Sequence, residues 1–259
     1  LMGPDSRPRC VRSTATGTGP LYRIEPVRGE PWVCNDVHVL TLVHTATDEV
    51  IDVPLDRWRA EHKTFRHLHK QFSVGVEFPP GAPPPIDPYF LGVWFGDGTK
   101  DLHNVGVSKP DPEIRDACEA MARAWNLSLT DATYGNPCPT YRIVGRRGRD
   151  NPLLTAPRSY LTASVADRRS FLAGWLDTDG YMNKGGYEII QKRRDYADAV
   201  AFLARSLGFA AHMSEKTVEP YGGVYWRVFI SGETSALPLR IPRKQAPPRA
   251  QIKVATRTG

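Results

Sequence analysis

The chain has 259 residues, 41% of them hydrophobic and 10% aromatic, which is enough for one large domain or two to three small ones with real cores. No apolar run reaches the roughly 18 residues of a membrane span and the first twenty residues are polar, which excludes a membrane anchor and a signal peptide. The composition therefore indicates an intracellular protein, of the nucleus or the cytoplasm. Leu1 is an unusual natural start and predicts a fragment of a longer chain.

The net charge of +6 is unevenly distributed along the chain. Residues 180–259 hold 13 Lys+Arg against 6 Asp+Glu, a surplus of +7, whereas residues 1–85 hold 10 of each. A basic region of this size suits a polyanion such as nucleic acid, with a solvated basic face as the alternative. The four cysteines lack C-x-x-C spacing, which favours reduced thiols over a zinc cluster.

The first third of the chain has the pattern of short strands. Alternating runs such as LYRIEPV and WVCNDVHVL, between residues 20 and 80, predict a small β-rich unit. The stretch LDRWRAEHKTFRHLHKQF, residues 55–72, has a helical pattern. Residues 79–88, PPGAPPPIDP, hold six prolines and predict a linker, because proline is excluded from helix interiors and central strands.

An internal repeat organises the rest of the chain. YFLGVWFGDG (89–98) has the shape of FLAGWLDTDG (171–180), and Asp97 precedes Asp179 by 82 positions. At the same offset MARAWNL (121–127) falls on LARSLGF (203–209), and TYRIVG (140–145) resembles VYWRVFISG (224–232) with about three more residues of displacement. Each half therefore predicts helix, strands and helix in a pseudo-twofold arrangement.

The ends of the two repeated helices have recognisable signals. Asp87 before Pro88, and Ser164 with Asp167 three residues later, predict N-caps. Gly98 and Gly180 are expected to end the helices in the left-handed conformation. Gly92 and Gly96, matched by Gly174 and Thr178, predict faces of small residues along which the two helices approach closely.

Such packing brings two carboxylates to the same end of the helix pair. Asp97 and Asp179 would each oppose a helix dipole and repel the other, which is costly without a cation. Hard divalent cations of the Mg²⁺ type take carboxylate oxygens, keep several waters and accept phosphate oxygens. The repeat therefore predicts a divalent-metal site, with ordinary helix-terminal acids as the alternative.

The residues LAGWLDTDG (172–180) and FLGVWFGDG (90–98) resemble the paired signature of LAGLIDADG homing endonucleases, over roughly residues 86–250. The second copy is near the consensus, and the first has Phe95 where an acid often stands. The resemblance implies an α+β fold of two pseudo-symmetric repeats, with mixed sheets packed by helices. Two four-stranded sheets would straddle the DNA major groove, and the signature helices would form the interface within a monomer.

The segment before the repeats resembles the splicing half of a large intein that carries such an endonuclease, close to the fungal spliceosomal inteins. His38, in WVCNDVHVL, falls where an intein histidine helps to activate the first splice junction, with Asn35 in place of the usual threonine. Residue 1 is neither Cys nor Ser and VATRTG lacks a closing His-Asn pair, so this chain is not expected to splice. An ordinary strand histidine explains His38 equally well.

The implied domains follow from both resemblances. They are a partial Hint-like splicing segment at 1–80, a linker at 81–88, repeat 1 at 89–165, repeat 2 at 166–250, and the start of a C-terminal splicing segment at 251–259.

The resemblance also implies roles for individual residues. Asp97 and Asp179 would be catalytic and bind Mg²⁺ or another divalent ion such as Mn²⁺, with Gly96 and Thr178 as neighbouring metal-site positions. Asp177 is expected to be structural. Lys244 is expected to organise water or stabilise the leaving group, whereas Leu154 or Thr155 stands where the first repeat would place its lysine, with Arg158 displaced. This departure makes nicking or slow cutting an alternative outcome.

Polar residues near the acids are candidates for contact with double-stranded DNA, because Arg and Gln read base edges and Lys positions on phosphates. The candidates are Lys100, Lys109, Arg142, Lys184, Gln191, Lys192, Arg193, Arg227 and Arg243. Exposed strand faces that tolerate any polar residue are the alternative, and Tyr225 and Trp226 are expected to pack on the sheet.

The leading hypothesis is a site-specific homing endonuclease that makes a metal-dependent double-strand break in an intein-free allele. One alternative is a cleavage-impaired DNA-binding protein of the same fold, either a nickase or maturase-like. Another is a vestigial nuclease within a protein-splicing intein.

Overall fold

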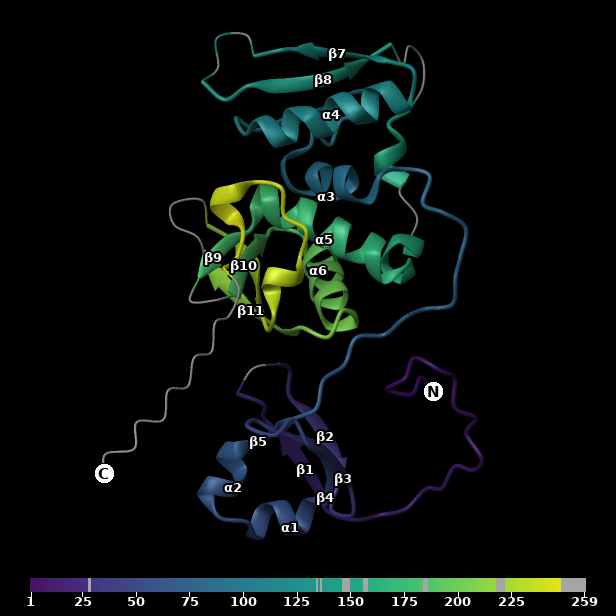
Figure 1. Cartoon of the computed structure of the whole chain (residues 1–259), viewed down its shortest axis with the longest axis vertical. Helices are drawn as coiled ribbons and strands as arrows, with labels where there is room; N and C mark the ends of the chain where they lie inside the picture. Colours follow the sequence, from purple (N-terminus) through teal and green to yellow (C-terminus); the bar gives the residue numbers. More distant parts are fainter. Residues whose placement is uncertain are drawn as a thin grey trace, which may run out of the picture.

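The computed structural model describes residues 1–27, 29–133, 135, 137–145, 150–155, 158–183, 186–217 and 222–247. Figure 1 shows an elongated molecule with the N-terminal strands at one end, a helical layer in the middle and a small sheet at the other end. Among the described residues, no helix has both the length and the apolar character needed to cross a membrane.

The N-terminal part forms two small antiparallel sheets. One pairs β1 with β2, and the other has the order β4-β3-β5. A core of only five buried apolar residues lies between them: Cys34, Leu40, Leu42, Val53 and Leu55. The elements are β1 (Leu21–Ile24), β2 (Trp32–Asn35), β3 (Val39–His44), β4 (Val50–Pro54), α1 (Leu55–Ala60), α2 (Lys63–Leu68) and β5 (His69–Gln71).

The helical stretch expected over residues 55–72 is two short helices and a strand, so that expectation is wrong in its continuity. The chain breaks at Glu61, and His62 starts a new helix by accepting a hydrogen bond from the Phe65 amide at 2.9 Å. Residues 69–71 then pair with β3, because the open edge of that strand offers backbone hydrogen bonds that a longer helix would forgo.

The remaining elements repeat. Helices α3 and α5 end 82 positions apart, at Asp97 and Asp179, and helices α4 and α6 share the same offset along their whole length. The first set is α3 (Pro88–Asp97), β6 (Val105–Ser108), α4 (Pro112–Ala124), β7 (Ser128–Asp131) and β8 (Thr140–Val144), followed by the 3₁₀ turns η1 (Pro152–Thr155) and η2 (Arg158–Thr162). The second set is α5 (Val165–Asp179), β9 (Tyr181–Asn183), β10 (Gly186–Gln191), α6 (Arg194–Ser206), β11 (Ala210–Thr217) and β12 (Val224–Ser231), followed by η3 (Thr234–Ala236) and η4 (Pro242–Lys244).

The registers refine the repeat. Tyr141 pairs with Val107, and Val228 pairs with Ile189, which is Val107 shifted by 82. The last strands are thus related by 87 positions, five more than the helices instead of the expected three. By this offset Arg142 corresponds to Phe229, so Arg142 and Arg227 are not equivalent.

The two sheets differ in strand number. The second has the order β11-β12-β10-β9, but within the described residues the first has the order β6-β8-β7, so the expected fourth strand of that sheet is not found there. The segment equivalent to β9 is reduced to one bridge, between Gly98 and Val107. It turns away because the Asp101 carboxylate accepts hydrogen bonds from the amides of His103 and Asn104, at 2.7 and 3.1 Å.

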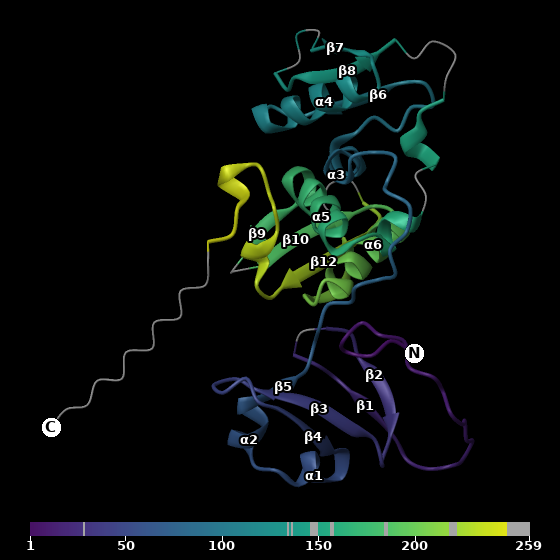
Figure 2. The same ribbon diagram turned by 45° about the vertical axis from the view of Figure 1, so that its right-hand side comes forward.

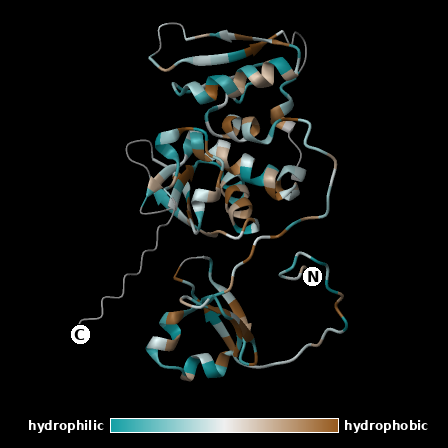
Figure 3. Cartoon of the chain, viewed as in Figure 1, coloured by the Kyte–Doolittle hydropathy of each residue, from teal (hydrophilic) through white to brown (hydrophobic). Residues whose placement is uncertain are grey.

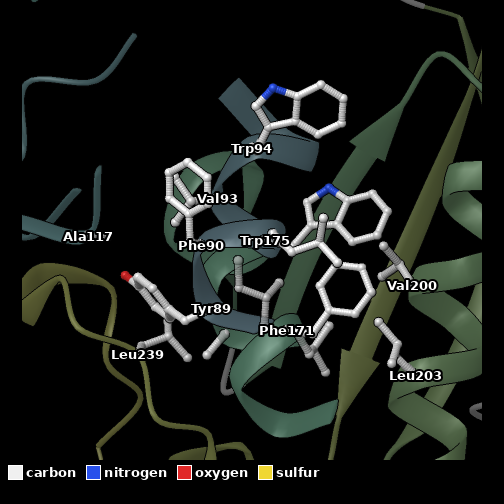
Figure 4. Packing of buried hydrophobic residues seen from close by; sticks show 14 of the residues in the cluster. Tyr89, Phe90, Val93, Trp94, Ala117, Phe171, Trp175, Val200, Leu203 and Leu239 are labelled. Atoms are coloured by element: carbon white, nitrogen blue, oxygen red, sulfur yellow. The ribbon is translucent and has the colours of Figure 1, made fainter. Parts of the chain in front are cut away.

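Helices α3 and α5 pack backbone to backbone in the centre of the main core (Figure 2). A Cβ added to Gly92 would lie 2.1 Å from the Phe171 carbonyl oxygen, and one added to Gly174 would lie 2.0 Å from that of Tyr89. Figure 4 shows Phe171 and Trp175 on the side of this pair that faces Val200 and Leu203 of α6. Apolar residues gather in these inner helices (Figure 3), as expected for helices buried on most sides.

The helix starts are as predicted and the helix ends are not. The side chains of Asp87 and Ser164 accept hydrogen bonds from the amides three residues later, at 2.7 and 3.1 Å. Gly98 and Gly180 are extended, with φ of −80° and −72°, so the left-handed ending is wrong. Glycine is needed there for space: a Cβ would lie 2.3 Å from the Trp94 carbonyl oxygen at Gly98.

Candidate functional site

The two repeated acids lie together at the C-terminal ends of the packed helices. Gly96 and Thr178 form the contact between them, and a Cβ at Gly96 would lie 2.0 Å from Thr178 Oγ1 and 3.4 Å from Asp179 Cγ. Only glycine therefore allows Asp97 and Asp179 to approach this closely. Both carboxylates lie where the helix dipoles are negative, which raises the cost of two uncompensated charges.

On one side, two lysines lie at the C-terminal end of α5, and one of them pairs with Asp97. Lys109 Nζ lies 2.7 Å from Asp97 Oδ2 in an ion pair and donates a hydrogen bond to the Thr178 carbonyl oxygen at 2.8 Å. Lys244 Nζ donates to the same Thr178 oxygen at 2.8 Å and to that of Leu176 at 3.1 Å. The two ammonium groups thus neutralise the end of α5 and the carboxylate beside it.

On the other side, Asp179 meets a neutral partner. Gln191 Nε2 donates a 2.6 Å hydrogen bond to Asp179 Oδ2. Lys100 Nζ donates to the Trp94 and Phe95 carbonyl oxygens at the end of α3, and lies 4.0 Å from the centre of the Trp94 ring. Lys100 therefore donates hydrogen bonds to the C-terminal carbonyl oxygens of α3, as Lys244 does to those of α5.

Burial changes the proton affinities of these groups. Desolvation lowers the pKa of Lys100 to about 8, although Asp179 and Asp97 favour its charged form. Desolvation, together with the nearby Lys109 ammonium, also lowers the pKa of Lys244 to about 8. The pKa of Asp179 is raised, first by burial and then by the Asp97 charge, while Gln191, Lys109 and Lys100 act in the opposite direction.

Lys100 supplies a lysine to the first repeat at a position that the sequence comparison with the second repeat did not indicate. That comparison placed the missing lysine near Leu154, whose side chain is exposed, or at Thr155 and Arg158, whose side chains lie outside the described residues. The sequence feature that could have indicated Lys100 is its position three residues after Asp97.

Asp177 has a different environment, as expected for a structural acid. It is fully buried, and Oδ2 accepts hydrogen bonds from Tyr89 Oη at 2.6 Å and from the Arg240 amide at 2.7 Å. The Ile241 amide donates to Oδ1 at 3.4 Å. Asp177 therefore joins both helices to the segment that brings Lys244 to the site.

The remaining candidates for DNA contact lie at varied distances from the acids. Lys192 and Arg193 lie between β10 and α6, where Lys192 is exposed and Arg193 stacks 4.2 Å from the Tyr196 ring centre. Arg142 lies on β8, and its buried Nε has no hydrogen-bond partner among the described residues. Lys184 lies outside the described residues.

Several of these candidates are engaged within the protein. Arg193 pairs with Asp195, and its Nε donates to Asp195 Oδ1 at 3.0 Å. Arg227 on β12 donates to Ser214 Oγ at 3.3 Å. Arg243 forms a two-pronged pair with Asp111 at 2.8 and 2.7 Å, which ties the end of repeat 2 to the start of α4. Gln191 is 7% exposed and held by Asp179, so its amide is not free to read a base.

His38 lies between β2 and β3 of the N-terminal unit, whereas the acids end α3 and α5. Its ring centre is 5.2 Å from that of Trp32, and both residues line an open groove of about 880 Å³. The structure does not bring His38 together with any of the other candidate residues.

The chemistry of the acids fits a hard divalent cation. Asp97 Oδ2 is buried and accepts no hydrogen bond from the described residues, and its direct partner is the Lys109 ammonium in the ion pair. No group of three or more His, Cys, Asp and Glu side chains that could hold a metal occurs in the described part of the chain. An ion would therefore rely on two carboxylates, carbonyl oxygens, water and the phosphate of a ligand, as Mg²⁺ commonly does. Thr178 Oγ1 is engaged with the Gly174 and Trp175 carbonyl oxygens.

Comparisons with known proteins find a family match in the second repeat. Residues 166–238 match the family model described as "LAGLIDADG-like domain". The chain is 35% identical over 136 residues to the replicative DNA helicase DnaB of Mycobacterium intracellulare, covering 51% of this chain and 21% of the relative. It is 24% identical over 165 residues to the homothallic switching endonuclease of Saccharomyces cerevisiae, covering 50% of this chain and 28% of the relative.

The solved structure of I-DmoI in complex with DNA and Mn is also similar, with 13% identity and a TM-score of 0.44, covering 56% of this chain and 88% of I-DmoI. The chain matches less than a third of the length of the two curated relatives. Residues 166–238 are therefore a LAGLIDADG-like domain, set in a chain of α+β fold.

Proposed function

We propose that this chain is a site-specific homing endonuclease that hydrolyses double-stranded DNA with a divalent cation, Mg²⁺ or Mn²⁺. The observation that carries the proposal is the meeting of Asp97 and Asp179 at the ends of two backbone-packed helices. Two carboxylates in such a place gain most from a cation that also accepts phosphate oxygens. The name of one similar protein, the homothallic switching endonuclease of Saccharomyces cerevisiae, supports an endonuclease activity.

Different residues would bind the metal ions and stabilise the charge that develops during hydrolysis. Asp97 and Asp179 would hold the divalent ions, and the ions, when bound, would activate water and stabilise charge on the scissile phosphate. Lys244 and Lys100, whose pKa values are lowered to about 8, would stabilise charge on the phosphate and leaving oxygen at either side. Hydrolysis adds water to phosphorus, breaks one P–O ester bond and returns the proton to the leaving oxygen.

Binding to DNA would rest on the basic residues around this centre. Lys192 and Arg193 have the exposure needed for phosphate contact, and Arg142 has an unused guanidinium nitrogen. The pseudo-twofold pair of repeats suits a monomer that contacts both halves of a long site.

A second candidate function is DNA binding with impaired cleavage, as a nickase or maturase-like protein. The observation that favours it is the Lys109 ammonium, which already neutralises Asp97 where a metal would act. We also propose, from the sequence resemblance alone, that the N-terminal unit is part of a Hint-like splicing segment of an intein. A chain with both splice junctions restored, assayed for excised protein, tests that context.

The deciding experiment is cleavage of a supercoiled plasmid that carries an uninterrupted copy of the host-gene junction, with Mg²⁺, with Mn²⁺ and with chelator. Linear product that requires the metal supports the endonuclease. Nicked circles alone support the nickase, and intact plasmid that still shifts in a gel supports the binding protein. Asp97→Asn and Asp179→Asn should each abolish linear product, by about 100-fold or more, while gel retardation persists. Full double-strand cutting by either variant would contradict the metal role.

A further inference from the structure

The two acids have unlike partners at equivalent places in the repeats. Lys109 follows β6 and Gln191 ends β10, and the two residues are 82 positions apart. Each side chain reaches the acid of its own repeat, Lys109 at 2.7 Å from Asp97 and Gln191 at 2.6 Å from Asp179. The pseudo-twofold axis therefore relates a charged ion pair to a neutral hydrogen bond.

Asp179 is the carboxylate with more to gain from a cation. Its described polar partner is the Gln191 amide, which carries no charge. Lys100, whose ammonium acts on both acids, donates its hydrogen bonds to the carbonyl oxygens of α3 at Trp94 and Phe95. Among the described residues no ammonium or guanidinium group forms an ion pair with the Asp179 carboxylate, whereas Lys109 forms one with Asp97.

Asp97 is already compensated. The Lys109 ammonium is held in place from two directions, by the Asp97 carboxylate and by the Thr178 carbonyl oxygen at 2.8 Å. Lys244 donates to the same carbonyl oxygen, so two positive charges lie where a cation would approach. A divalent ion that binds at Asp97 would be repelled by these ammonium groups or would have to displace them. The repulsion between like charges at such short distances is large at a partly buried site.

We propose that the two acids bind divalent cations with unequal affinity, that Asp179 is occupied first, and that Lys109 is the residue that delays occupancy at Asp97. The inference rests on the proposed metal role of both acids. It follows that the strand served by Asp179 is cut before the strand served by Asp97.

Binding of Mn²⁺ to the DNA-free protein tests the affinities without any activity. Titration of the whole chain, with unbound Mn²⁺ measured by electron paramagnetic resonance, should show two classes of site that differ about tenfold or more. Asp179→Asn should remove the tighter class, and Asp97→Asn should leave it. Lys109→Gln, which reproduces the residue found at 191, should tighten the weaker class about tenfold.

Two further variants test whether the effect comes from a positive charge beside the acid: a converse substitution and a distant control. Gln191→Lys should weaken the tight class by a similar factor, because it places an ammonium beside Asp179. Lys63→Gln, on the exposed surface of α2, removes the same charge far from the acids and should change neither class, since distant exposed charges are screened. Circular dichroism of each variant confirms that the fold is retained.

Several results would overturn the inference. They are two classes of equal affinity, loss of the tighter class in Asp97→Asn instead of Asp179→Asn, a Lys109→Gln titration like that of the unmodified chain, or no Mn²⁺ bound at millimolar concentration. Metal-dependent linear product alongside any of these results leaves the proposed function standing and removes only the order of filling. Failure to cut DNA with any divalent ion, alongside two unequal Mn²⁺ classes, removes the proposed activity and leaves the inference standing.

Discussion

Tyr89 in α3 donates a 2.6 Å hydrogen bond to Asp177 in α5, so the two central helices are joined by a buried polar contact as well as by packing. The guanidinium of Arg240 lies 3.7 Å from the centre of the Tyr89 ring, and the Arg240 amide donates to the same carboxylate. The segment that carries Lys244 is therefore fixed to both helices through one acid.

Replacing Tyr89 with Phe should destabilise the protein by about 1 to 3 kcal/mol, because it leaves the buried Asp177 carboxylate short of a donor. We expect a lower midpoint of thermal unfolding and a lower cleavage rate, since Lys244 loses part of its support. Replacing Tyr22 with Phe in the N-terminal unit is the control, and it should leave cleavage unchanged. An unfolding midpoint for the Tyr89 variant equal to that of the parent would show that the contact contributes nothing net.

Replacing Gly174 with Ala should be more damaging, because the new methyl group would lie 2.0 Å from the Tyr89 carbonyl oxygen. The helices must separate, and overpacking of this kind costs about 1 to 3 kcal/mol or more. The separation also moves Asp179 away from Asp97, so cleavage should fall more than stability alone explains. Gly17→Ala is the matched control, since nothing lies within 4 Å of the added atom. Equal unfolding midpoints for the two alanine variants would contradict the close packing.

The sequence predicted those features that depend on local chemistry. The caps at Asp87 and Ser164 and the glycine-lined contact between the helices need only neighbouring residues or a repeated spacing, and each is present in the structure. These signals involve residues close together in the chain, so one sequence is enough to show them.

Features that depend on distant partners were not predicted. The strand at 69–71 forms because β3 has an open edge, and this overrides a helical pattern. Lys100 reaches the carbonyl oxygens of α3 because the chain turns at Asp101. The same turn takes the place of the strand that β9 forms in the second sheet. The pairing of Gln191 with Asp179 likewise required the register of β10 beside α5.

Asp179→Asn should stabilise the metal-free protein at neutral pH. The pKa of Asp179 is raised in the folded state, so folding favours the protonated acid. That contribution is fully present below the unfolded pKa, and it is lost as the pH rises through the raised folded value. Asparagine resembles the protonated form and should keep the stability at neutral pH, so the advantage of the variant should shrink in acid.

Thermal unfolding at several pH values, with chelator, measures this effect. Addition of Mg²⁺ should raise the midpoint of the parent chain and leave that of Asp179→Asn nearly unchanged, because a ligand stabilises only the state that binds it. If the variant is less stable than the parent at neutral pH, the hydrogen bond from Gln191 to the Asp179 carboxylate of the parent outweighs the cost of burying the charge.

Lys100→Met should convert double-strand cutting into nicking. The substitution removes an ammonium whose charge acts on both acids and leaves the Trp94 and Phe95 carbonyl oxygens without their lysine donor. Loss of a charge that stabilises developing negative charge costs about 100-fold in rate, so one strand should be cut slowly and nicked circles should accumulate. Leu154→Ala is the control, because Leu154 is where the sequence placed the missing lysine and its side chain is 42% exposed. If the Lys100 variant linearises plasmid at the parent rate while Leu154→Ala does not, the lysine of the first repeat is not Lys100.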